Sequence, residues 1–137
     1  MKKLLFWLLA SLFLGCSAQE DVAVYETSHV QLYGPDASKL GLSGKLIKNE
    51  HKFTVDLDEK SVVVSSATYK DTMKIVSVLY NDYSELIDIR YDILFKLNDK
   101  EGRLCYLFIT SKYLLCVDED LVTSIVYIRK GRTFDGL

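Results

Sequence analysis

The chain has 137 residues, of which 49% are hydrophobic and 26% charged, and its formal net charge is −2 at pH 7. It has room for one globular domain, and it holds no internal repeat. Beyond the N-terminus, no run is long and uncharged enough to span a membrane. Binding nucleic acid requires several phosphates to be neutralised at once, and the densest basic cluster is the short one at 129–132, so we expect no nucleic-acid partner.

The N-terminus has the parts of an export signal. Two lysines near the start precede eleven uncharged residues at 4–14, and small residues follow at 15–18. A membrane-spanning helix needs about 20 apolar residues, whereas the core of a signal peptide needs about 7–15. We therefore predict that residues 1–18 are a signal peptide and that 19–137 form a single exported β-domain.

The sequence contains two alternative processing sites. Cleavage after Ala18 follows a small-residue pattern and releases a secreted soluble protein. Alternatively, the stretch 13–16 resembles a bacterial lipoprotein box through Gly15 and Cys16, so that the signal ends at Gly15 and Cys16 carries the lipid. Each buried methylene of an acyl chain adds about 0.8 kcal/mol of membrane affinity. We favour this alternative, which predicts an outer-membrane or periplasmic lipoprotein of the cell envelope, attached to the membrane by its lipid.

Short runs with a period of two predict β-strands through the rest of the chain. Turn residues separate these runs every 8–12 residues, which is typical of antiparallel β-proteins. Between 36 and 47, three glycines interrupt the leucines and predict a loop with one helical turn. We expect an all-β antiparallel meander of about eight short strands, arranged as a small barrel or a two-layer sandwich. The strands are predicted around 30–32, 53–57, 61–65, 74–80, 87–97, 105–109, 113–117 and 122–128.

Apart from Cys16, the cysteines are Cys105 and Cys116, which flank a predicted hairpin. An even number of cysteines in an oxidising compartment predicts a disulfide bond between them. A two-residue turn that starts at Thr110 places them directly opposite each other, whereas other turns shift the register so that they do not face. The alternative is a pair of buried thiols.

Metal and catalytic motifs are weak. The acidic turns at 56–58 and 118–120 offer oxygen ligands for calcium, but neither has the twelve-residue spacing of an EF-hand loop. His29 and His51 are the only histidines and have no cysteine near them in sequence, so they do not predict zinc. The glycines of 41–44 lack the spacing of a nucleophile elbow. We expect no metal, no cofactor and no catalytic residue.

The aromatic residues of the predicted strands include Tyr91, Phe95, Tyr106 and Phe108. They either line a ligand pocket or fill the core, and we favour the core because aromatic rings bury the most surface. No ligand-binding residue is assigned. These observations predict an exported, non-enzymatic β-domain that binds a protein or a surface ligand in the bacterial cell envelope. The alternatives are a carrier of a small apolar ligand in a barrel interior and an unrecognised hydrolase.

Overall fold

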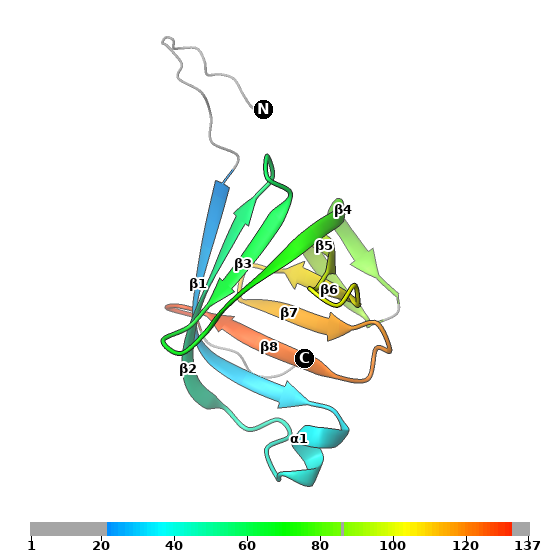
Figure 1. Ribbon diagram of the computed structural model, residues 1–137. Helices are drawn as coiled ribbons and strands as arrows, with labels where there is room; N and C mark the ends of the chain where they lie inside the picture. The colour runs from blue at the N-terminus through cyan, green and yellow to red at the C-terminus, as the bar shows by residue number, and fades with distance from the viewer. Residues whose placement is uncertain (1–21, 86, 133–137) are drawn as a thin grey trace.

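The computed structural model describes residues 22–85 and 87–132 (Figure 1). Its eight strands form one antiparallel sheet in which each strand pairs with the next, and β8 pairs with β1 to close a barrel. The predicted all-β meander is confirmed, and of the two expected arrangements it is the barrel. The elements are β1 (Val22–Tyr33), α1 (Pro35–Lys39), β2 (Ile47–Asp56), β3 (Ser61–Ser65), β4 (Lys70–Ser84), β5 (Ile89–Asn98), β6 (Leu104–Ile109), β7 (Tyr113–Asp118) and β8 (Ser124–Arg129).

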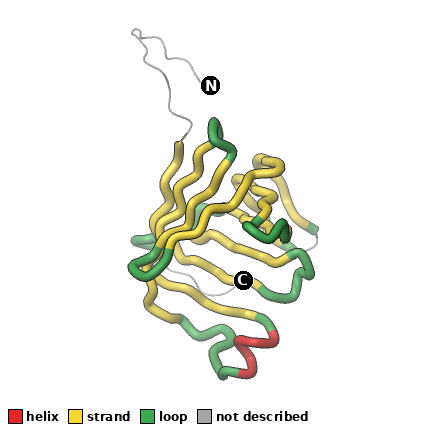
Figure 2. The backbone as a smooth tube through the Cα atoms, in the orientation of Figure 1, coloured by secondary structure: helices red, strands yellow, loops and turns green. Residues whose placement is uncertain are grey.

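The short helix α1 lies in the connection from β1 to β2, at one end of the barrel (Figure 2). Proline at its start supplies the backbone angle that a first helical turn needs. Gly34 precedes it with φ of +127°, and a Cβ there would lie 3.2 Å from the Cα of Thr123, so this tight entry requires glycine. Within 22–85 and 87–132, no helix has the length and apolar character needed to cross a membrane.

Strand β1 begins at Val22, well before the predicted start near residue 30. Its register with both neighbouring strands shifts between Thr27 and His29, which marks a β-bulge. One extra residue breaks the period of two, so that Thr27 and Val30 are both buried although they lie three residues apart. The alternation that predicts strands therefore fails at this point in the sequence.

Inward-facing side chains fill the middle of the barrel. Phe53 is 1% exposed, and its ring meets the edge of the Tyr127 ring with centroids 4.8 Å apart. This close packing supports the predicted aromatic and aliphatic core. The cluster also includes Val55, Val62, Val64, Phe95, Leu97, Leu107, Ile109 and Leu114.

A second apolar layer covers the outside of β6, β7 and β8. Outward-facing residues such as Phe108, Leu115 and Val126 are buried there, packed with Tyr91 and with the partly buried Ile89 from β5. Near its end, β4 turns sharply at the right of Figure 1. Asn81 of this strand has a φ of +50°. The folded-back tip of the β4–β5 hairpin thus contributes the cover that this outer face needs.

The four aromatic residues that the sequence offered as an interior lining are divided between the two layers. Phe95 lies in the barrel interior, whereas Tyr91, Tyr106 and Phe108 belong to the outer layer. The rings of Tyr91 and Phe108 pack edge to face with centroids 5.5 Å apart. These three rings stabilise the fold from outside and do not line an interior cavity.

Candidate binding site at one mouth of the barrel

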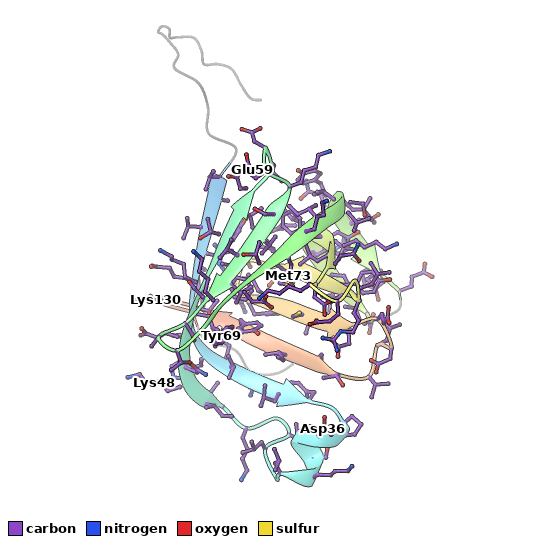
Figure 3. The ribbon with its side chains drawn as sticks, in the orientation of Figure 1. Asp36, Lys48, Glu59, Tyr69, Met73 and Lys130 are labelled. Atoms are coloured by element: carbon purple, nitrogen blue, oxygen red, sulfur yellow. The ribbon has the colours of Figure 1, made fainter. Side chains whose placement is uncertain are left out.

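One end of the barrel opens into an apolar hollow of about 200 Å³ between β1–β2 and β4–β5. In Figure 3, Glu59 at the β2–β3 turn marks this end of the molecule and Asp36 marks the opposite end. We call this hollow the apolar mouth. It is lined by Val22, Ala23, Tyr25, Val55, Leu57, Tyr80, Ile93 and Phe95.

The mouth exists because the strands do not end at the same level. Strand β1 pairs with β2 from Val22 onward, but it pairs with β8 only from Thr27 onward. The first residues of β1 therefore project beyond β8. At this end the inward-facing Tyr25 and Phe95 form the floor of the hollow.

The rim of the apolar mouth is exposed and hydrophobic. Val22, Leu57 and Tyr80 are 42%, 37% and 56% exposed, and all three line the hollow. Single exposed apolar residues are common on protein surfaces, but several around one hollow indicate an interaction site. The arrangement is suited to receiving an apolar group.

A cation lies at the edge of the mouth floor. The guanidinium carbon of Arg129 is 5.2 Å from the centroid of the Tyr25 ring, and Nη1 of Arg129 donates a hydrogen bond of 2.9 Å to the carbonyl of Thr110. Burial raises the pKa of the Tyr25 phenol, and the Arg129 charge opposes this rise. Tyr25 is therefore neutral at physiological pH and keeps its O–H donor.

Basic side chains continue outward from this edge. Arg129, Lys130 and Arg132 line a shallow hollow together with Val24 and Glu26. Three cations around one carboxylate give this side of the mouth a local positive charge, although the chain as a whole is acidic. An acidic group on a ligand is attracted to this side.

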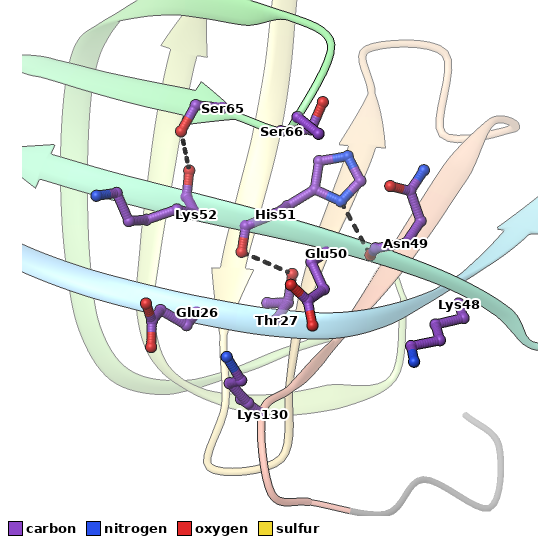
Figure 4. A pocket seen from close by; sticks show the side chains of 11 residues that line it. Glu26, Thr27, Lys48, Asn49, Glu50, His51, Lys52, Ser65, Ser66 and Lys130 are labelled. Carbon is purple, nitrogen blue, oxygen red and sulfur yellow. Dashed lines mark hydrogen bonds between the residues drawn. The ribbon is translucent and has the colours of Figure 1, made fainter.

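A polar groove of about 550 Å³ lies beside the β1 bulge (Figure 4). It brings together His51, Ser65, Ser66 and Glu50, which are the residue types that a hydrolase uses. These side chains do not hydrogen-bond to one another. His51 Nδ1 is 3.3 Å from the carbonyl oxygen of Asn49. The Ser65 hydroxyl donates to the carbonyl of Lys52, and the Ser66 hydroxyl bonds with that of Thr68. In the part of the chain that the structure describes, no hydrogen bond joins His51 to a serine or a carboxylate. The groove does not support the hydrolase alternative.

The environment of His51 is that of a core residue. Its ring packs against the edges of Tyr127 and Tyr69, with centroids 5.0 and 5.8 Å apart. Burial lowers the pKa of the imidazole, which is therefore neutral at pH 7. His29 lies at the bulge, where its Nδ1 is 2.9 Å from the hydroxyl of Ser28. The two histidines do not share a site.

The cysteine hairpin has a different register from the one that places its cysteines opposite each other. Cys105 pairs with Asp118, and Cys116 with Leu107, so the cysteines are diagonal neighbours. The cause is Thr110, whose hydroxyl bonds with both the N–H and the carbonyl of Tyr113 and closes the turn one residue later.

Both cysteines of this hairpin are free thiols in the structure. The interaction of the two thiols lowers the pKa of Cys105, and the same interaction together with burial raises the pKa of Cys116. Diagonal neighbours on one face remain within reach of each other. The disulfide bond between Cys105 and Cys116 therefore stays a prediction.

The acidic turns use their carboxylates within the turns themselves. Asp56 accepts a hydrogen bond from the N–H of Glu59, and Asp120 accepts one from the N–H of Val122. Among the residues described, no three His, Cys, Asp or Glu side chains form a group that could hold a metal ion.

Cys16 lies outside the described residues, so its lipidation also stays a prediction.

No protein-family model, curated protein or solved structure matches this chain. The site is therefore assigned from its geometry alone. Sequence reasoning did not find the apolar mouth, because Val22 and Tyr25 precede the first predicted strand and the bulge hides their period. A signal was nevertheless present in the uninterrupted apolar run at 22–25.

Proposed function

We propose that this chain is an exported, non-enzymatic binding domain of the bacterial cell envelope that holds an apolar side chain of a protein partner in its apolar mouth. The observation that carries the proposal is the ring of exposed Val22, Leu57 and Tyr80 above a floor that contains Tyr25 and Phe95. Protein interfaces concentrate their binding energy where an anchor side chain fills such a pocket.

The size of the mouth favours a protein anchor over a carried small molecule. Its volume is about 200 Å³. Sites for drug-sized ligands typically have about 300–1,000 Å³ and enclose most of the ligand. Below the mouth, side chains such as Phe53 and Leu107 fill the barrel interior, each 1% exposed. The mouth therefore suits one or two side chains better than a whole small molecule.

The charge beside the mouth indicates the polar part of the partner. Arg129, Lys130 and Arg132 lie on one side of the apolar surface. Complementary charges increase the rate of association and orient the partner. We infer that the partner presents an apolar anchor next to acidic residues.

A lipid on Cys16 would hold the mouth close to the membrane. Val22 starts β1 at the same end as the mouth, and it follows Cys16 by six residues. A chain of six residues spans at most about 20 Å. The proposed partner is accordingly a protein that lies at or in the membrane of the envelope.

The apolar mouth is tested by the substitution Leu57→Glu in the full-length chain. A buried carboxylate in the contact should weaken partner binding about tenfold or more, because it must lose its hydration. The partner is captured from detergent-solubilised envelope membranes by the wild-type chain, identified by mass spectrometry, and its affinity is then measured for each variant.

The matched control for this substitution is Leu40→Glu. Leu40 is 72% exposed and follows α1, at the other end of the barrel. We expect this variant to bind the partner with the affinity of the wild type. Equal affinity of Leu57→Glu and wild type, or equal loss in both variants, would contradict the proposed site.

The lipid anchor is tested by Cys16→Ala in cells. The wild-type protein is expected in the membrane fraction, with an N-terminus whose mass includes acyl chains, since several chains together give stable anchoring. The variant is expected in the soluble fraction. Cleavage after Ala18 in the wild type, without added lipid mass, would show that the exported protein is soluble.

A further inference from the structure

The end of the barrel opposite the apolar mouth contains a second hollow, of about 410 Å³. Its lining includes the three sulfur-bearing residues Met73, Cys105 and Cys116, and Met73 on β4 lies beside the β5–β6 turn (Figure 3). We call it the sulfur mouth. The carboxylates of its lining are Asp71, Asp99, Asp118, Glu119 and Asp120.

The sulfur atoms have the spacing of ligands that share one ion. Cys105 Sγ lies 3.8 Å from Met73 Sδ, and Cys116 lies diagonally across from Cys105 on the neighbouring strand. A metal–sulfur bond of about 2.3 Å places two sulfurs of a tetrahedral ion about 3.8 Å apart. Cys105 and Met73 therefore need little movement to bind a common ion.

Three strands of the barrel hold these ligands, and β5 separates the first of them from the other two. Met73 is on β4, Cys105 on β6 and Cys116 on β7, and all three belong to the interior cluster or pack against it. The register places Cys105 and Cys116 diagonally on one face, which is where the Thr110 turn directs them. A one-residue change of register would send one cysteine to the other face of the sheet.

The chemistry of the ligand set selects the ion. Zinc and calcium sites are built from three or more histidine, cysteine or carboxylate ligands, and the described part of the chain contains no such group. Two thiols and one thioether are soft ligands, which favour Cu(I). A set that contains only sulfur therefore points to a soft monovalent cation.

The rim of the sulfur mouth carries negative charge that attracts a cation. Lys100 pairs with Asp71, and Arg103 pairs with Asp99. In the described ranges, the three carboxylates at 118–120 form no ion pair, and Asp118 lies directly across from Cys105 in the sheet. Acidic side chains around an opening raise the local concentration of cations.

We propose that, while Cys105 and Cys116 are reduced, they form a binding site for one Cu(I) ion together with Met73; a disulfide bond between the two cysteines would exclude the ion. The site is separate from the proposed partner site, because it lies at the other end of the barrel. On binding, each thiol releases its proton to solvent and forms a metal–sulfur bond, while the thioether donates a lone pair. No electron is transferred, and the copper stays Cu(I).

The test uses the full-length chain with Cys16→Ala, in which Cys105 and Cys116 are the only thiols. The reduced protein is titrated with Cu(I) under anaerobic conditions in competition with bicinchoninate, and native mass spectrometry counts the bound ions. We expect one Cu(I) per chain. Failure of the reduced protein to compete for Cu(I) would overturn the proposal.

The decisive variant is Met73→Leu, which removes the thioether and keeps the side-chain volume, so that packing is preserved. We expect its Cu(I) affinity to fall about 10- to 100-fold, the range found for changes around metal ligands. The double variant Cys105→Ser, Cys116→Ser should lose Cu(I) binding, and its thermal unfolding is compared with the parent to establish that it folds.

A charge control separates the sulfur ligands from the acidic rim. The substitution Glu119→Gln removes one rim carboxylate and no sulfur, and it should leave one Cu(I) bound with nearly the parent affinity. If Met73→Leu and the cysteine variant bind Cu(I) as the parent does while Glu119→Gln weakens it, the ion is held by the rim and the proposal is wrong.

Discussion

Val126→Asp should destabilise the protein by about 3–5 kcal/mol, although Val126 points outward from the barrel. In a simple barrel an outward-facing aspartate would be hydrated, and the substitution would hardly change the free energy of unfolding. Here Val126 is 0% exposed under the outer apolar layer, so the new carboxylate would lose its water without gaining a partner. Urea unfolding followed by circular dichroism measures the change in unfolding free energy.

Val76→Asp is the matched control for this prediction. Val76 is also a strand valine, but it is 50% exposed on β4. Its replacement should change the unfolding free energy by no more than about 0.5 kcal/mol, as at most surface sites. Similar small effects of both substitutions would show that the outer face of β6–β8 is not covered.

Phe53→Ala is expected to lower the free energy of unfolding by about 3–5 kcal/mol. A typical domain has an unfolding free energy of about 5–15 kcal/mol, so this loss is a large part of the total. The ring of Phe53 is 1% exposed and packs against that of Tyr127, so its deletion leaves a cavity in the middle of the barrel. The same urea experiment measures this loss, with an unfolding midpoint well below that of the wild type.

Tyr83→Ala controls for the loss of an aromatic ring as such. Tyr83 is 42% exposed, and the guanidinium carbon of Arg90 lies 5.9 Å from the centroid of its ring. We expect a loss within about 1 kcal/mol. A Phe53→Ala variant as stable as Tyr83→Ala would mean that the interior is not packed as the structure has it.

The elements that the sequence predicts well are those with unbroken alternation. In strand β2, His51, Phe53 and Val55 are buried and polar residues lie between them. In strand β5, every second residue from Ile89 to Leu97 is apolar, so the local pattern suffices. The helical turn predicted between residues 36 and 47 is confirmed as α1, one residue earlier, where Pro35 starts it.

Two features of the candidate sites could not be predicted in this way. The start of β1 is hidden by the bulge at Thr27–His29, and with it the apolar mouth. The register of the cysteine hairpin depends on one side chain, Thr110, that bonds to Tyr113 across the turn. Counting residues between Cys105 and Cys116 does not distinguish the possible turns.

The sequence by itself determined the all-β class, the meander and the number of strands, because alternation and turn residues are local properties of a chain. Tertiary structure alone decided that the sheet closes and that β6–β8 are buried on both faces. It also decided that Met73, far away in sequence, lies 3.8 Å from Cys105. These outcomes depend on bulges, on strand stagger and on the β4–β5 tip folding back, which bring together residues that no local pattern relates.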